Sequence, residues 1–238
     1  MENLFLDPFT ILLIAGFIGF FMAFGIGAND VANSMGTSVG SKAITIKQAI
    51  IIAAIFEFLG AFLAGGEVTS TIRKGIVDPD IYANDINIFV IGMMAALLAG
   101  GTWLYIASLR GWPVSTTHSI VGSIIGFVLI TKGVDAVSWS KVGNIAMSWV
   151  TSPVFSATLA FALYMSAKKL ILDRAEPEKA AITYIPFYSF LVAVVISLVT
   201  ARKGLKHVGI QWSDNEMYLF IFIFSYCICF YADSFKER

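Results

Sequence analysis

Residues 9–26 read FTILLIAGFIGFFMAFGI and contain no charged side chain. A helix of about 20 apolar residues is long enough to cross the hydrocarbon core of a bilayer, which is about 30 Å thick. Six further apolar segments follow along the chain, at residues 46–65, 88–109, 114–131, 142–167, 182–201 and 217–231. The sequence therefore predicts an all-α integral membrane protein with about seven hydrophobic segments.

The composition indicates the same class of protein. Hydrophobic residues make up 58% of the 238 residues and charged residues only 13%, whereas soluble domains carry about 25% charged residues. The longest hydrophilic stretches, 67–87, 168–179 and 202–216, are too short to fold as separate soluble domains. We therefore predict a single membrane domain over residues 1–238, multi-pass in the cell (plasma) membrane.

The charge balance excludes one class of partner. The chain carries 16 basic and 16 acidic residues and has a formal net charge of zero. It therefore lacks the basic field that attracts nucleic acid. The expected surrounding is the lipid bilayer, with no nucleic acid bound.

Residues 25–41, GIGANDVANSMGTSVGS, form a first polar island directly after the first apolar segment. Irregular backbone at membrane depth is tolerated only where protein or a water-filled cavity satisfies its polar groups, and glycines permit it. Secondary transporters build their binding sites from discontinuous helices of this kind. We therefore predict a broken or re-entrant helix here. If residues 29–33 are helical, Asn29 and Asn33 lie on one face with Asp30 beside them.

Residues 113–123, PVSTTHSIVGS, form a second polar island before another apolar segment. A proline at the first helical position, followed by hydroxyl groups and a histidine, predicts a helix N-terminus that points into the protein. Free N–H groups and a partial positive charge at such an end suit the oxygens of phosphate. The residues that we assign to the anion are Asn33, Ser115, Thr116, Thr117 and His118. For His118, titration and capping of a neighbouring helix are alternative roles.

Asp30 requires a cation if an anion binds nearby. A carboxylate about 4 Å from a phosphate would be repelled by roughly 4 kcal/mol at an effective dielectric constant near 20. Sodium held by Asp30, nearby amides such as that of Asn29 and backbone carbonyls, or a proton on Asp30, would cancel this repulsion. Binding of the anion and the cation would then be linked, which is the thermodynamic basis of symport.

Glu57 lies in the middle of an apolar segment, within FEFLGA at residues 56–61. An ionised side chain that faces lipid costs at least about 3 kcal/mol, so we expect Glu57 to face inward. Two roles are open for it: a second cation-binding carboxylate, or a hydrogen-bond partner for an unwound helix.

These motifs resemble those of the inorganic phosphate transporter family, the Pit-type phosphate permeases. GANDVAN at residues 27–33 is similar to the family signature, and PVSTTH at residues 113–118 is similar to its second polar motif. FEFLGA also resembles family members, and the similarity runs in order along nearly the whole chain. The resemblance implies a helical transporter of inverted repeats, each carrying both motifs, that moves inorganic phosphate together with sodium or protons.

The chain differs from family members in having one copy of each motif where they have two, and members are much longer. Residues 215–231 resemble the helix that leads into the second signature, which does not follow before Arg238. We therefore expect the first repeat only, truncated before the second signature, as one half of an inverted-repeat transporter. If both repeats contribute to the site, transport requires a second subunit, as in a homodimer, or is absent.

Three alternatives to phosphate symport remain at this point. A permease for sulfate or another oxyanion would use the same helix N-terminus and hydroxyl groups. A hydrolase using Ser115 and His118 would lack a Gly-x-Ser-x-Gly context and would leave residues 29–33 unexplained. An inactive half-transporter would insert in the membrane without transport. We expect a permease and not an enzyme, with no cofactor beyond the coupling ion.

Overall fold

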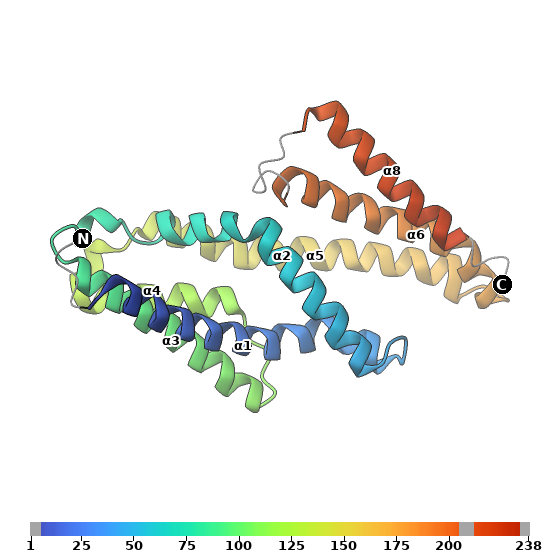
Figure 1. Cartoon of the computed structure of the whole chain (residues 1–238). Helices are drawn as coiled ribbons and strands as arrows, with labels where there is room; N and C mark the ends of the chain where they lie inside the picture. The colour runs from blue at the N-terminus through green and yellow to red at the C-terminus, as the bar shows by residue number, and fades with distance from the viewer. Residues whose placement is uncertain (1–5, 205–211, 234–238) are drawn as a thin grey trace. The chain divides into compact units, whose positions relative to one another are not determined.

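The computed structural model describes residues 6–204 and 212–233, with only the backbone described at residues 63, 64, 66–75, 203 and 204. These residues form helices joined by short loops. The α-helices are α1 (Pro8–Gly40), α2 (Ile46–Gly75), α3 (Ile86–Leu109), α4 (Thr116–Lys132), α5 (Trp139–Ala167), α6 (Pro177–Val199) and α8 (Asp214–Asp233) (Figure 1). Each of the seven predicted hydrophobic segments coincides with one of these helices. The prediction of an all-α fold is confirmed.

Polar side chains fix where several of these helices begin. The Asp7 carboxylate accepts hydrogen bonds from the N–H groups of Phe9 and Thr10, at 3.0 and 3.2 Å, so α1 begins at Pro8. Thr45 and Gln48 form a capping box at the start of α2. Such caps satisfy N–H groups that have no partner inside the helix. The caps therefore fix where α1 and α2 begin.

Five helices among the described residues are long and apolar enough to cross a membrane: Pro8–Gly40, Ile86–Leu109, Trp139–Leu172, Pro177–Arg202 and Asp214–Asp233. α4 is apolar but shorter. Large hydrophobic side chains such as Phe17, Phe155 and Phe222 are exposed on the surface of the chain, as expected where lipid or further protein replaces water.

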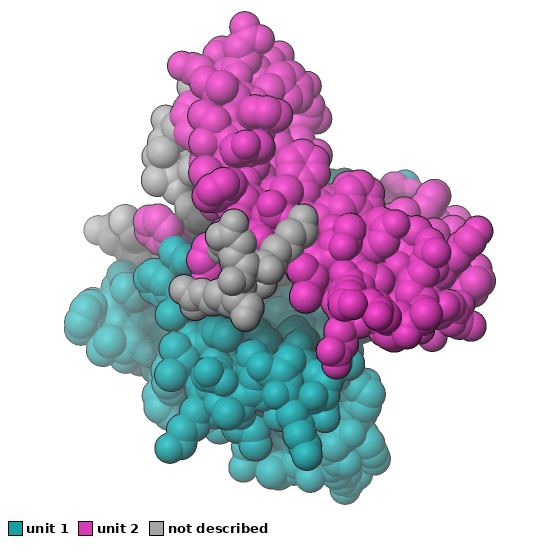
Figure 2. All heavy atoms as spheres, turned by 90° about the vertical axis from the view of Figure 1, so that its right-hand side faces the viewer, with its two compact units in different colours: residues 1–59, 68–143 teal, residues 60–67, 144–238 magenta. Residues whose placement is uncertain are grey.

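The chain divides into two compact units, shown in Figure 2. Unit 1 comprises residues 1–59 and 68–143, and unit 2 comprises residues 60–67 and 144–238. The single membrane domain over residues 1–238 stays a prediction.

In unit 1, α1 packs along α3, and α3 packs along α4 (Figure 1). A Cβ atom built on Gly25 of α1 would lie 3.2 Å from Leu104 Cβ of α3, and one built on Gly101 would lie 3.1 Å from Met22 Cα. Gly19 lies beside Leu97 in the same way. Because the contacts advance together along both helices, α1 and α3 run parallel, and their small residues allow the two backbones to approach closely.

α4 runs antiparallel to α3. Gly100 of α3 lies beside Ser123 of α4, whereas Gly92, two turns earlier, lies under the ring of Phe127. A Cβ atom on Gly92 would lie 1.9 Å from Phe127 Cε2, which no side chain tolerates. This contact fixes the position of α4 along the axis of α3.

We expect Gly92→Ala to lower the free energy of unfolding by about 1–3 kcal/mol, the usual cost of overpacking a core. The Phe127 ring stacks on Tyr82, with centroids 5.5 Å apart, and would have to leave this position. Thermal unfolding of the purified protein in detergent measures the change. The matched control is Gly126→Ala on α4, where a Cβ meets no atom within 4 Å. Equal stability of the two variants would contradict the packing described.

In unit 2, α6 and α8 pack side by side (Figure 1). Ala193 and Ser197 of α6 and Ser225 of α8 are all buried. At the other end of this helix pair lies an apolar groove of about 440 Å³, whose lining includes Ile182, Ile185, Ile228 and Tyr231.

Pro153 lies inside α5 and Pro186 inside α6, where each removes one backbone hydrogen bond.

The expected break in the first polar island is wrong. α1 continues as one helix through residues 25–40 and ends at Gly40, with Ser41 as its C-cap. No proline lies inside α1 after its first turn, and the polar side chains find local partners, as Ser34 Oγ does in donating to the Asp30 carbonyl at 2.9 Å. Among the island's glycines, only Gly25 makes a close helix contact, since a Cβ on Gly27, Gly36 or Gly40 would meet nothing within 4 Å.

Candidate functional site

Asn29 joins α1 to the loop between α3 and α4. Its side chain is buried, at 5% exposure. Nδ2 donates to the carbonyl of Trp112 at 2.9 Å and to Ser108 Oγ at 3.4 Å, and Oδ1 accepts from the N–H of Val114 at 3.3 Å. One amide therefore holds both a donor and an acceptor of the loop backbone, because a carboxamide offers both functions.

The position of Asn29 follows from the packing below it. Gly25 lies one turn earlier on α1 and allows close approach to Leu104 of α3. One turn further along both helices, Asn29 then lies beside Ser108. Ser108 itself donates to the carbonyl of Leu104 at 2.8 Å, so its hydroxyl oxygen faces the amide of Asn29.

The second polar island begins a helix, but three residues later than predicted. Ser115 is the N-cap of α4, and its Oγ accepts from the N–H of His118 at 3.3 Å. The expectation that Pro113 is the first helical residue is wrong, because that position belongs to Thr116. Pro113 lies in the loop that Asn29 holds, and its ring restricts the preceding residue to extended backbone.

Asp30 and Thr116 bring the two polar islands together. Thr116 Oγ1 donates to Asp30 Oδ2 at 3.1 Å, across 86 residues of sequence. Both side chains are half-buried. A carboxylate therefore lies at the first turn of α4, where helix geometry leaves the N–H groups of Thr116 and Thr117 without an acceptor inside the helix.

The other predicted anion residues lie around this contact with exposed side chains. Asn33 is one turn beyond Asn29 on α1, and Ser115, Thr117 and His118 are in the first turn of α4 or at its cap. Ser115, Thr117 and His118 thus lie together at one helix end, whereas Asn33 lies on another helix. Their contact with phosphate stays a prediction.

Glu57 is placed differently from the expectation. It lies on α2 with an exposed side chain, and the residues around it, Phe56 and Phe58, are exposed as well. The expectation that it faces the interior is therefore wrong for this chain taken alone. Among the described residues, no hydrogen bond joins Glu57 to Asp30 or Thr116. Its role in cation binding stays a prediction.

Two residues of the site were not predicted from the sequence. Ser108 and Trp112 hold the amide of Asn29, and Arg110 lies with its guanidinium 4.9 Å from the centroid of the Trp112 ring. The available signal was a serine, an arginine and a tryptophan together at the end of an apolar segment. Such residues are also common at membrane interfaces, so the signal alone did not distinguish the two roles.

The described residues hold no group of three or more His, Cys, Asp or Glu side chains that could form a metal centre. The site instead combines one carboxylate with hydroxyl groups, amide oxygens and a helix N-terminus. Hard cations take such oxygen ligands, and anions bind at helix N-termini. The arrangement is suited to holding both kinds of ion side by side.

The comparisons with known proteins point to one family. The model of the phosphate transporter family matches residues 26–232. A protein of Haemophilus influenzae named as a phosphate permease is 54% identical over 203 residues, which cover 85% of this chain and 48% of the relative. A chloroplastic inorganic phosphate transporter of Arabidopsis thaliana is 47% identical over 179 residues, covering 75% of this chain and 30% of the relative.

A solved structure described as the sodium-dependent phosphate transporter matches with a TM-score of 0.85 and 40% identity, over 94% of this chain and 54% of that one. The chain thus spans about half the length of the first of these relatives and of the solved transporter. Because the family match extends over most of the residues and several helices can cross a membrane, the protein is an integral multi-pass membrane protein. The chain belongs to the phosphate transporter family.

Proposed function

We propose that this chain carries one half of a cation-coupled transport site for inorganic phosphate. The observation that supports the proposal most strongly is the hydrogen bond of 3.1 Å between Thr116 Oγ1 and Asp30 Oδ2. It puts a carboxylate at the N-terminus of a helix that has the features of an anion site. Such a pairing is useful to a transporter that must bind an anion and a cation together.

On the anion side, phosphate would bind at the first turn of α4. The N–H groups of Thr116 and Thr117 and the hydroxyl groups of Ser115 and Thr117 supply donors, and the helix dipole favours negative charge. The amide of Asn33 lies on the exposed face of α1, one turn from Asn29. We assign phosphate to these groups and to the imidazole of His118.

On the cation side, Asp30 would hold sodium or a proton. Without a cation, an ionised Asp30 about 4 Å from phosphate would oppose its binding by roughly 4 kcal/mol at an effective dielectric constant of 20. With a cation the repulsion is cancelled, so each ion strengthens the binding of the other. The solved relative is described as sodium-dependent, which favours sodium as the coupling ion here.

The sequence suggested Asn29 as a cation ligand, but we propose that it acts first as a support for a loop. Its Nδ2 and Oδ1 are both engaged with the loop between α3 and α4. A carboxamide oxygen has two lone pairs, so Oδ1 could still complete a sodium site. Its first role is to hold the loop that precedes α4.

Phosphate binding tests the contact between Thr116 and Asp30. We expect Thr116→Val, which loses the hydroxyl group that donates to Asp30 Oδ2, to weaken binding of labelled phosphate by about tenfold, because this hydroxyl group stabilises the carboxylate beside the anion. The measurement is equilibrium binding to purified protein in nanodiscs at saturating sodium. The matched variant Thr116→Ser keeps the hydroxyl group and should bind within about twofold of the original chain, since the donor to Asp30 remains.

Competition by sulfate belongs to the same experiment. Phosphate donates a hydrogen bond near neutral pH and sulfate does not, so a carboxylate acceptor favours phosphate. If sulfate displaces phosphate at equal concentration, the result would favour the alternative of a permease for oxyanions in general. Equal phosphate affinity in Thr116→Val and Thr116→Ser would show that the contact of Thr116 with Asp30 does not support phosphate binding.

A further inference from the structure

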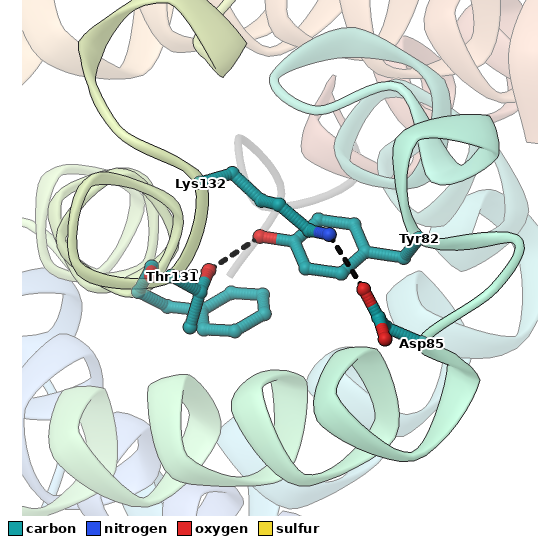
Figure 3. A network of polar contacts seen from close by, with 5 residues as sticks. Tyr82, Asp85, Thr131 and Lys132 are labelled. Carbon is teal, nitrogen blue, oxygen red and sulfur yellow. Dashed lines mark hydrogen bonds and ion pairs between the residues drawn. The ribbon is translucent and has the colours of Figure 1, made fainter.

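At the opposite end of α4 from the polar site, four side chains form a second polar network (Figure 3). Lys132 Nζ lies 2.7 Å from Asp85 Oδ2 and 5.0 Å from the centroid of the Tyr82 ring. The Tyr82 hydroxyl lies 2.6 Å from Thr131 Oγ1. Because Thr131 donates its own proton to the carbonyl of Phe127, Tyr82 is the donor of this bond. We call Tyr82, Asp85, Thr131 and Lys132 the clasp.

The charges of the clasp suit the helix ends on which they lie. Asp85 is the N-cap of α3, yet its side chain makes no capping hydrogen bond there and pairs with Lys132 instead. Lys132 is the last residue of α4. A negative charge at a helix N-terminus and a positive charge at a C-terminus are both favourable, so the pair adds to the two helix dipoles.

Apolar packing makes the clasp rigid. Tyr82 is only 1% exposed, and its ring stacks on Phe127, whose ring in turn lies on Gly92 of α3. Close by in sequence, Val77 and Val137 form a backbone bridge that joins the loops before α3 and after α4. These contacts therefore fix this end of α4 relative to α3.

The clasp and the polar site are the two ends of one 17-residue helix. A helix is stiff along its axis, so a shift at Lys132 moves Thr116 by a similar amount. Moving α4 by one turn, about 5.4 Å, would break both the ion pair and the contact of Thr116 with Asp30. We propose that Asp85, Lys132 and Tyr82 are positioning residues that hold Thr116 against Asp30. The effect on phosphate binding rests on the proposed function.

Cross-linking tests the positioning directly and does not require transport. Asp30→Cys and Thr116→Cys are combined with Cys227→Ser and Cys229→Ser, and the two new thiols are joined in membranes by the shortest bifunctional methanethiosulfonate. We expect Asp85→Asn, which removes the charge at constant shape, and Asp85→Lys to reduce the cross-linked fraction severalfold. The exchange Asp85→Lys with Lys132→Asp should restore it.

The matched control is the ion pair between Glu176 and Lys179. It is also short, at 2.6 Å, but its side chains are 63% and 78% exposed, against 43% and 24% for Asp85 and Lys132. Glu176→Gln should leave the cross-linked fraction unchanged. A cross-linked fraction that does not fall in Asp85→Asn, or that stays low in the charge exchange when that protein inserts normally, would overturn the proposal.

Phosphate binding separates this proposal from the proposed function. With Asp30 and Thr116 intact, Asp85→Asn should weaken phosphate binding about tenfold, since a misaligned donor loses a hydrogen bond to charge. The charge exchange should restore it. If the unaltered chain does not bind phosphate while cross-linking changes as expected, the proposed function fails and the clasp stands. If both phosphate binding and the cross-linked fraction are normal in Asp85→Asn, the clasp has no positioning role.

Discussion

Replacing Asp30 by asparagine should make phosphate binding independent of sodium. Asparagine has the same shape and keeps an oxygen that accepts the bond from Thr116 Oγ1, so the helix contact survives. The charge that repels phosphate and attracts the cation is lost. Because coupling free energies of about 1–3 kcal/mol correspond to roughly 5–150-fold changes in affinity, a sodium effect of this size should disappear. In any assembly that transports phosphate, uptake driven by an ion gradient should stop.

Asp135→Asn is the control for this variant. Asp135 is an exposed acidic residue of the same unit, in the loop after α4, outside the polar site. Its loss changes the total charge equally and should leave the sodium effect intact. Sodium-dependent phosphate binding or full gradient-driven uptake in Asp30→Asn would show that the cation binds elsewhere.

Removing the amide of Asn29 should have the largest effect on stability. Asn29→Ala deletes the hydrogen bonds to the Trp112 carbonyl, to the Val114 N–H and to Ser108. Leaving a buried donor or acceptor unsatisfied costs about 1–3 kcal/mol for each group, so we expect a loss of roughly 2–4 kcal/mol. Thermal unfolding in detergent measures it. Phosphate binding should weaken as well, because the loop that precedes α4 is no longer held.

Asn33→Ala is the matched control for stability. Asn33 lies one turn further along α1 and is exposed, so its loss should change the free energy of unfolding by no more than about 0.5 kcal/mol. Similar destabilisation by the two alanine variants would show that the amide of Asn29 does not hold the loop.

The membrane class and the number of helices could be predicted because they depend on the length and polarity of each segment. The runs 9–26 and 217–231, for example, lie inside α1 and α8. The meeting of the two polar islands was also foreseeable, since buried polar side chains need partners. The particular partners, Asp30 with Thr116 and Asn29 with the loop after α3, depend on the way α1 packs along α3.

The errors have physical causes as well. The glycines of residues 25–41 favour unwinding, but glycine lowers helix stability without removing a backbone hydrogen bond, and α1 is continuous. Proline is favoured at the first helical position, which predicts a start at Pro113, but Ser115 provides a hydroxyl cap two residues later. The clasp was missed because Tyr82, Asp85 and Lys132 look like ordinary charged and aromatic residues at the ends of membrane helices.

A titration of phosphate affinity against sodium tests whether an anion and a cation share the site at Asp30 and Thr116. Labelled phosphate is bound to the purified chain in nanodiscs at several sodium concentrations and fixed pH, with potassium replacing sodium at constant ionic strength, and then at several pH values without sodium. We predict that sodium strengthens phosphate binding at least about fivefold, or that protons do so if they are the coupling ion. Phosphate affinity that is the same at every sodium concentration and every pH would contradict the account.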